Sequence, residues 1–395
     1  MDAQERVLKA INHEEPDKVP AFESTITNNG LKKYYGIEIE KSEIQLYKSL
    51  SKLGKKGDRL LQKGYCNKNI VKSVMRNFYE FCKRAHLDLV LSMGALFNRK
   101  LLENGEGFID EFGRIMKFES YVDKNGIETV IVGYHGSVIN SFEDYESWEQ
   151  PDPNWEARLI NFEAGREVQE EMNNRVFSIP AISALMEVTW ESFGLENFSK
   201  LFARSAQIKK VFDDRGKFTL ELVKILAEHD AKIILLWDDY GYKNGLFMSP
   251  RNYRKYVFPW IKRICDAAHR MDCKIMLHSD GDLTEILDDI VNSGVDVLNP
   301  IEPTTANPDY TICNLKEKYG DKLTLSGNIS PMLLASGPIQ EIISYSKRLI
   351  KEIAPGGGFL FGSGHSINPA IPPQHYEAMQ QIKEQYGSYP IDHNF

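Results

Sequence analysis

The feature that most constrains the fold of this 395-residue chain is a series of eight short apolar runs, most of them separated by stretches with helical periodicity. The runs occupy residues 19–24, 87–93, 176–182, 233–239, 274–280, 295–301, 323–329 and 359–365. Each run is continuously apolar rather than alternating, which is typical of strands that are buried on both faces of a parallel sheet. Eight strand and helix units favour an α/β TIM (β/α)8 barrel over an open sheet.

Two segments exceed what a minimal barrel needs. Residues 31–87 form a mostly helical N-terminal excursion, and residues 107–138 alternate polar and apolar side chains around the turn Asp123-Lys124-Asn125-Gly126. Because Asn-Gly favours a tight hairpin, we predict an antiparallel β-hairpin insertion over one face of the barrel at about 107–138. No low-complexity linker interrupts the chain, so we expect a single domain over residues 1–395.

The intervening helices carry recognisable start and stop signals. The stretch from Ser249 to Met271 is predicted to be a helix with Ser249 as N-cap and Pro250 at its first position. The helix that follows residue 280 is expected to end at Gly294.

Composition excludes several classes of protein. The chain has 48 Lys and Arg against 56 Asp and Glu, a net charge of −8, and no basic patch, which argues against nucleic-acid binding. Its apolar runs fall short of the roughly 20 residues that span a bilayer, and its N-terminus is charged, so we expect a cytoplasmic protein without membrane association. The five cysteines form no C-x-x-C pair and are expected to be mainly core residues.

Active sites of TIM barrels lie at the carboxyl ends of the strands. The polar residues expected there are Glu23, Asp238, Asp239, His278, Asp280, Asn299, Glu302, Asn328 and His365. Several titratable side chains therefore converge on one mouth of the predicted barrel.

The strongest local signal is the segment MLHSDGDL, in which His278 closes a strand and Asp280 follows two residues later. A His-x-Asp pair offers nitrogen and oxygen ligands for Zn²⁺, with further ligands from Asp239, Glu302 or His365. The alternative is that these side chains only form hydrogen bonds with loops at the barrel rim.

The remaining candidates have equally plain alternatives. Adjacent strand residues point to opposite sides, so only one of Asp238 and Asp239 is expected to face the barrel axis. Asp239 either binds a metal or accepts a proton, or it only caps the following turn. Glu302 is either a metal ligand or a rim acid. Gly281 permits a sharp turn, and Gly281 and Asn328 are the candidate cofactor-binding positions. Trp190, Phe193, Trp237, Tyr240 and Tyr242 either line a pocket for a ring-bearing substrate or belong to the core.

Six segments together resemble the uroporphyrinogen decarboxylase superfamily over nearly the whole chain. They are RVLKAINHEEPDKVP, DDYGYKNGLFMSP, LHSDGDL, VDVLNPIEP, LSGNIS and GSGHSINPAIPP. The resemblance implies a TIM-like barrel. The superfamily contains cofactor-free porphyrinogen decarboxylases and zinc-dependent methyltransferases that act with corrinoid proteins or thiols. In the decarboxylases an arginine pair after the first strand binds the substrate propionates, whereas FESTITNNGLKKYYG at residues 22–36 has no arginine. The resemblance thus argues against porphyrinogen decarboxylation.

The thiol-directed methyltransferases of this superfamily bind zinc through a His-x-Cys motif and a second cysteine, and His278, Asp280 and His365 stand at these positions here. A nitrogen and oxygen ligand set leaves a more Lewis-acidic ion, which suits the oxygen of a methyl ether better than a thiol. The chain is most similar to the O-demethylase branch, whose members share the DEFGR segment found at residues 110–114.

This resemblance implies a corrinoid-dependent methyltransferase. Zn²⁺ would be held by His278, Glu302 and one of Asp239, Asp280 or His365, and Asp239, His278 and His365 would be the catalytic residues. A methyl group would pass from a small methylated donor, such as an aryl methyl ether, to the cobalamin cobalt of a partner corrinoid protein. Two other functions stay open: a metal-free decarboxylase or lyase using Asp239 and His365 as acid and base, and a non-catalytic corrinoid-binding barrel. The sequence also leaves open whether the protein is a homodimer.

Overall fold

Seven strands form a curled parallel sheet in the computed structural model, which describes residues 1–39, 43–93 and 97–395. In spatial order, which is also chain order, they are β1 (Leu89–Met93), β6 (Phe177–Ser183), β7 (Ile233–Trp237), β10 (Lys274–His278), β11 (Val297–Asn299), β12 (Thr324–Ile329) and β13 (Phe359–Ser363). The remaining predicted strand, residues 19–24, makes parallel bridges from Ala21 to Phe361 of β13 and from Phe22 to Leu89 of β1. It therefore joins the two edge strands of the sheet. The prediction of a TIM-barrel-like α/β fold is confirmed.

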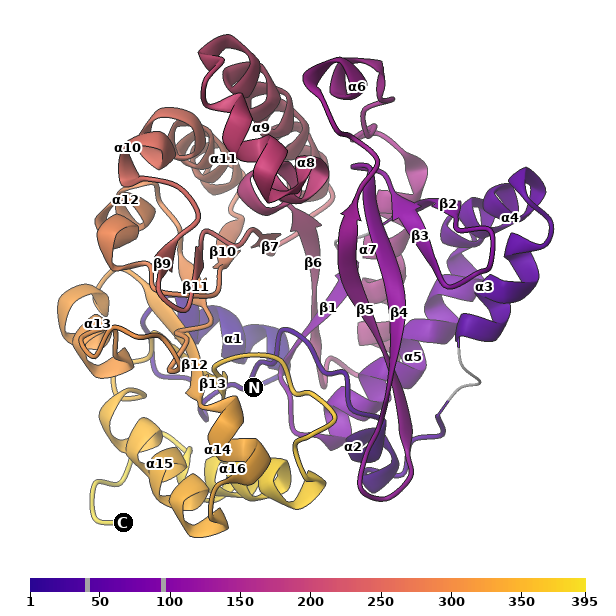
Figure 1. Cartoon of the computed structure of the whole chain (residues 1–395). Helices are drawn as coiled ribbons and strands as arrows, with labels where there is room; N and C mark the ends of the chain where they lie inside the picture. The colour runs from indigo at the N-terminus through magenta and orange to yellow at the C-terminus, as the bar shows by residue number, and fades with distance from the viewer. Residues whose placement is uncertain (40–42, 94–96) are drawn as a thin grey trace.

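Helices cover the outer face of this sheet, as Figure 1 shows. They are α8 (Met186–Leu201), α9 (Ser205–Glu228), α11 (Phe258–His269), α12 (Leu287–Asn292), α13 (Ile312–Tyr319), α14 (Pro331–Ser336), α15 (Ile339–Glu352) and α16 (Pro373–Tyr386). A 3₁₀ turn at Thr284–Ile286 leads into α12, and the chain leaves this helix through Gly294 at φ +91°. That stop signal is where the sequence predicts it.

The helix predicted from Ser249 is interrupted. Pro250 does occupy its first position in α10 (Pro250–Asn252), but the Ser249 side chain makes no capping hydrogen bond. A π-helical turn at Tyr253–Val257 then joins α10 to α11. Pro259 lacks the N–H that an α-helix would donate to the carbonyl of Lys255, which accounts for the irregular turn there.

The barrel interior is an apolar cluster that is closed at one end by α1 (Ala3–Ile11). Ile233 and Leu235 of β7 and Met276 of β10 point inward and pack with one face of α1. The residues between them on the strands belong to the outer cluster under the helices, so both faces of the sheet are buried, as predicted. Backbone bonds from α1 to the starts of strands place this helix at the amino end of the barrel, for example from Gly358 N to Ala10 O at 2.7 Å. The carboxyl ends therefore form the opposite mouth.

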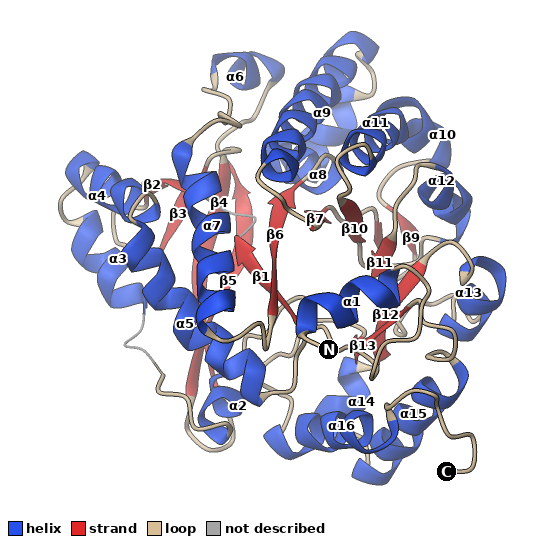
Figure 2. Cartoon of the chain, turned by 180° about the vertical axis from the view of Figure 1, so that it is seen from behind, coloured by secondary structure: helices blue, strands red, loops and turns tan. Residues whose placement is uncertain are grey.

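A separate antiparallel sheet stands beside the barrel. Its strands are β2 (Asn98–Leu101), β3 (Gly107–Asp110), β4 (Arg114–Val122) and β5 (Glu128–Ser137). The β4–β5 hairpin turns through 123–126, as its Asn-Gly pair predicts, and the sheet starts earlier than expected because β2 pairs with β3. The excursion at 31–87 is helical in its described part, and Figure 2 shows its helices on the same side of the molecule as this sheet. They are α2 (Asn29–Tyr34), α3 (Glu43–Ser51), α4 (Lys55–Tyr65) and α5 (Lys68–Arg84).

Helix α7 (Glu156–Glu171) packs against β1, β6 and α5. The remaining elements are short: α6 (Phe142–Ser147) and the hairpin of β8 (Gly241–Tyr242) and β9 (Gly245–Leu246). Cys82, Cys265 and Cys273 are buried, as expected for core residues, and Cys66 and Cys313 are half-buried. Within the described ranges, none of the helices has both the length and the apolar composition that crossing a membrane requires.

Candidate metal centre and active site

Three predicted site residues come together at the carboxyl ends of β7 and β10. Asp239, His278 and Asp280 each offer a ligand atom, and these atoms lie within 4.8 Å of one another. The inward parity of the two strands explains this arrangement, because Asp239 continues the series 233, 235, 237, and His278 and Asp280 continue from Met276. The loop also holds the acids together, since Asp280 N donates to Asp239 Oδ1 at 2.9 Å.

A hydrogen bond to Asn299 orients the His278 ring. Its Nδ1 lies 2.8 Å from Asn299 Oδ1, and Asn299 Nδ2 donates to Ser326 Oγ at 2.8 Å. Asn299 therefore accepts through its oxygen, so His278 carries a proton on Nδ1 and directs Nε2 toward the cluster. That Nε2 lies 4.0 Å from Asp239 Oδ1, and Trp237 stacks on the imidazole with ring centroids 4.4 Å apart. His278 is thus held as a nitrogen donor facing two carboxylates.

His365 lies at the edge of the same cluster. Ser366 N donates to His365 Nδ1 at 2.8 Å, so the ring proton is on Nε2, which lies 3.1 Å from Asp280 Oδ2. The hydrogen bond to Asp280 raises the pKa of His365 above its ordinary value. Burial alone would raise the pKa of Asp280, but the hydrogen bond from His365 and the nearby His278 lower it. His278 and His365 thus both lie close to Asp280 in the structure.

The cluster fits a divalent cation chemically. Burial and the neighbouring Asp280 carboxylate raise the pKa of Asp239 to about 6, which shows that the site disfavours a second negative charge unless a cation offsets it. Asp280 Oδ1 is buried without a hydrogen-bond partner in the described part of the chain. One imidazole nitrogen and two carboxylates are donors that Zn²⁺ accepts.

The other acid of the Asp238-Asp239 pair points to the outside of the barrel, as strand alternation requires. Asp238 Oδ1 accepts the backbone N–H groups of Leu185, Met186 and Glu187 at 3.0, 2.6 and 2.9 Å. Leu185, the N-cap residue of α8, offers no side-chain oxygen, so Asp238 replaces the missing cap. Burial nevertheless raises the pKa of Asp238 to about 7.

Glu302, Gly281 and Asn328 lie outside the three-residue cluster. Glu302 accepts from Gly281 N at 2.8 Å through Oε2 and from the Thr304 hydroxyl through Oε1. Asn328 is buried, and its Oδ1 accepts from Tyr345 at 2.8 Å. Their predicted roles in metal and cofactor binding stay predictions.

The family follows from comparison with known proteins. Residues 127–386, about two thirds of the chain, match the family described as uroporphyrinogen decarboxylase (URO-D). The chain belongs to the uroporphyrinogen decarboxylase family. Two curated relatives, both named uroporphyrinogen decarboxylase, come from Magnetococcus marinus and Alkalilimnicola ehrlichii. The first is 26% identical over 202 residues, covering 50% of this chain and 53% of the relative. The second is 25% identical over 258 residues, covering 61% and 66%.

The chain thus spans about half to two thirds of the length of these relatives. A solved structure titled methyltransferase from Methanosarcina mazei superposes with a TM-score of 0.65 at 17% identity and covers 98% of this chain and 99% of its own. This likeness shows a shared fold over the whole length of both chains.

Helix α8 adds acids to the mouth of this family member that the sequence analysis missed. Glu191 pairs with Arg114 of β4, with Oε2 2.6 Å from Nη1, and Arg114 Nε donates to Asp110 Oδ2 at 2.7 Å. Burial and the nearby Asp239 carboxylate raise the pKa of Glu187, which lies one turn earlier on α8. The available signal was the spacing of Glu187 and Glu191, which puts both on one face of a helix that follows a strand.

The predicted aromatic residues divide between core and surface. Phe193 and Tyr240 are buried in the outer cluster. Trp190 and Trp237 are half-buried, and Tyr242 is 47% exposed. The aromatic lining of a pocket therefore stays a prediction for Trp190, Trp237 and Tyr242.

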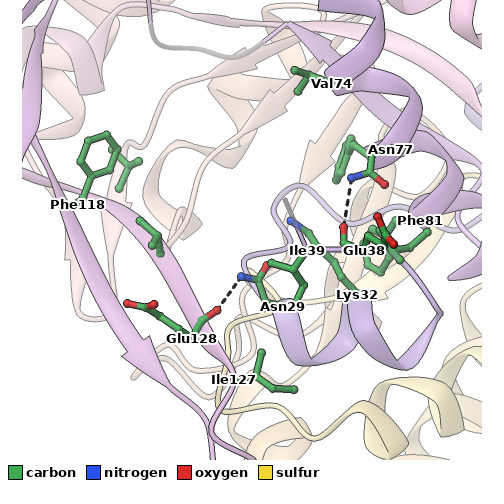
Figure 3. A pocket seen from close by; sticks show the side chains of 14 residues that line it. Asn29, Lys32, Glu38, Ile39, Val74, Asn77, Phe81, Phe118, Ile127 and Glu128 are labelled. Atoms are coloured by element: carbon green, nitrogen blue, oxygen red, sulfur yellow. Dashed lines mark hydrogen bonds between the residues drawn. The ribbon is translucent and has the colours of Figure 1, made fainter. Parts of the chain in front are cut away.

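A cavity lies away from the three-residue cluster. It has a volume of about 460 Å³ and is enclosed by α2, α5 and the β4–β5 hairpin, as Figure 3 shows. Asn29 closes one side by donating to the backbone oxygen of Glu128 at 2.8 Å. The lining combines apolar side chains such as Phe118 and Val74 with polar ones such as Lys32 and Glu38, and it includes none of the cluster residues.

Proposed function

We propose that the protein is a zinc-dependent methyltransferase that moves a methyl group from a small methyl ether, such as an aryl methyl ether, to the cobalt of a corrinoid carried by a partner protein. The observation that carries this proposal is the cluster of Asp239, His278 and Asp280 at the carboxyl ends of the strands. Membership of the family and the fold shared with a protein titled methyltransferase are compatible with it.

The chain would hold Zn²⁺ through His278 Nε2 and carboxylate oxygens of Asp239 and Asp280. Bound there, the ion would supply Lewis acidity that draws electrons from the ether oxygen. Asn299 keeps the His278 lone pair directed at the site, and His365 orients Asp280. These contacts prepare the ligands before substrate arrives.

The proposed transfer breaks the methyl carbon to oxygen bond and forms a carbon to cobalt bond, with cobalt supplying the electron pair. The departing oxygen keeps the electrons of the broken bond and requires a proton. His365 holds a proton on Nε2, which lies 3.1 Å from Asp280 Oδ2 at the edge of the cluster. His365 is therefore the proposed proton donor to the departing oxygen.

A metal-free decarboxylase is the second candidate, favoured by the His365–Asp280 pair, which could transfer protons without a metal. The curated relatives carry that activity in their names. Against porphyrinogen substrates, residues 22–36 contain no arginine to bind propionates.

Metal quantification joined to a methyl-transfer assay separates the two. The assay uses reduced corrinoid protein and a panel of methoxylated aromatics, and the variants are His278→Ala and, as control, His135→Ala, which removes an exposed histidine paired with Glu119 at 2.8 Å. We expect about one zinc per wild-type chain, and loss of zinc and of transfer only in His278→Ala. A wild type without stoichiometric metal, together with unchanged transfer in His278→Ala, would refute the proposal.

A further inference from the structure

One face of α8 carries buried polar atoms that the described chain leaves without hydrogen-bond partners. They are Oε2 of Glu187 and Nε1 of Trp190, three residues apart and thus on neighbouring turns. Arg114, which pairs with Glu191 on the same face, has a third such atom, Nη2. Buried polar atoms are nearly always paired in folded proteins, so three unpaired atoms on this helix and on the arginine that pairs with it indicate that another molecule completes them.

The Arg114 side chain is only 3% exposed, and two of its nitrogens are already committed to Asp110 and Glu191. The Arg114 and Glu187 side chains also interact electrostatically, so the two are neighbours. Arg114 therefore presents a rigid, buried donor rather than a mobile surface charge.

The same face has aromatic walls. The Trp190 ring stacks on Phe247 with centroids 5.2 Å apart and an interplanar angle of 26°, and it meets Tyr134 edge-on at 5.6 Å. Tyr242 also contacts Phe247, with ring centroids 5.6 Å apart. Aromatic side chains around polar atoms suit a flat ligand that bears a polar substituent.

The position is next to the proposed metal cluster. Asp238 binds the first N–H groups of α8, including that of Glu187, and the next residue is Asp239 of the cluster. A ligand held by the α8 face would therefore extend toward the residues that we propose to act on the ether oxygen.

We propose that Glu187, Trp190 and Arg114 form a polar subsite that binds a hydroxyl group on the ring of the substrate. A hydroxyl donates one hydrogen bond and accepts two, which matches one carboxyl oxygen and two N–H donors. It can donate to the Glu187 carboxyl in either protonation state, because an ionised carboxylate and the carbonyl oxygen of a neutral carboxyl both accept. The preferred substrates are then methoxylated arenes that carry a free hydroxyl. This inference rests on the proposed function for its choice of methoxylated ligands.

Calorimetric binding to the full-length protein, without corrinoid, tests the subsite apart from methyl transfer. The probes are 2-methoxyphenol and methoxybenzene, which differ by the hydroxyl alone. We expect the wild type to bind 2-methoxyphenol about tenfold more tightly, the size of one net hydrogen bond. Trp190→Phe keeps the ring but removes the donor, and Glu187→Leu removes the carboxyl, so each should reduce the preference to about twofold or less.

Two controls separate the subsite from general structural damage. Trp260→Phe removes an indole N–H that is bonded to Asp213 on distant helices, and Glu187→Gln retains hydrogen-bonding capacity. Both should keep the tenfold preference. A wild type that does not prefer 2-methoxyphenol, or a preference that persists in Trp190→Phe and Glu187→Leu, would mean that water alone occupies these atoms and would overturn the inference. Equal weakening of both probes would overturn it too, because it indicates lost packing.

The two proposals can fail separately. Hydroxyl-selective binding without methyl transfer would leave the subsite in place and remove the proposed function. Methyl transfer without hydroxyl selectivity would support the proposed function and overturn the subsite.

Discussion

Replacement of Arg114 by methionine should destabilise the protein strongly. Arg114 lies between Asp110 and Glu191, with its Nε 2.7 Å from Asp110 Oδ2 and its Nη1 2.6 Å from Glu191 Oε2. The side chain of Asp110 is 0% exposed and that of Glu191 9%, so water cannot solvate their charges once the cation is gone. Methionine preserves most of the apolar stem, and the loss is therefore mainly electrostatic.

Breaking a buried ion pair by removing one partner costs about 3–5 kcal/mol. A folded domain is stable by only about 5–15 kcal/mol, so Arg114→Met should lose a large part of the total. The assay is urea unfolding followed by circular dichroism. Arg76→Met is the matched control, because Arg76 makes an equally short 2.7 Å contact with Glu171 but both side chains are 40% exposed or more. That change should cost no more than about 1 kcal/mol.

A second variant identifies the cause. If the cost comes from uncompensated carboxylates, adding Asp110→Asn and Glu191→Gln to Arg114→Met should recover part of the lost stability. Equal unfolding free energies for Arg114→Met and Arg76→Met would refute the reasoning, since the burial of the network would then have no energetic consequence.

Three further outcomes follow from the structure. Gly281→Ala should destabilise the protein by more than about 1 kcal/mol in urea unfolding, because Gly281 has φ +92° and an added Cβ would lie 2.3 Å from Tyr242 N. Glu384→Gln should lower stability at pH 7 but not at pH 2. Burial alone would raise the pKa of Glu384, but Lys383 and Lys18 lower it from 4.5 to about 2. The stabilisation that the ionised carboxylate provides is therefore present above pH 4.5 and is lost as the pH falls toward 2. Thermal unfolding across this range measures the difference. Asn299→Ala should weaken zinc binding about 10–100-fold in a chelator competition, because the cluster histidine loses the partner that orients it.

The strands were predictable because the information is local. Each run is apolar on both faces, and a strand covered on both faces needs only that pattern and a boundary. Because the pattern is apolar on both faces, it could not show which of Asp238 and Asp239 points into the barrel. Ile234 and Leu235 are equally apolar, so nothing in the run distinguishes inward from outward positions, and only the closed sheet with α1 inside it does.

The site was predictable as far as it lies on strand ends. His278, Asp280 and Asp239 are in register because β7 and β10 are neighbours, with His278 paired to Trp237. The α8 face was not predictable, since the contact between Arg114 and Glu191 joins residues 77 positions apart through an insertion whose docking the sequence does not encode locally. Buried ionic residues on a helix look like a solvated face until the covering segment is known.

The Asp238-Asp239 dipeptide links the cluster at the strand ends to the α8 face. Because alternate strand residues point to opposite faces, one dipeptide contributes to the interior cluster through Asp239 and anchors α8 through Asp238. The position of the α8 face relative to the cluster is therefore fixed by two adjacent peptide units rather than by a flexible loop. The insertion binds the same helix from the other side, through Tyr134 OH, which donates to Glu191 O at 2.8 Å, and through Arg114. A barrel strand and the insertion thus position one helix between them, so changes in the insertion should alter which ligand binds while leaving the cluster intact.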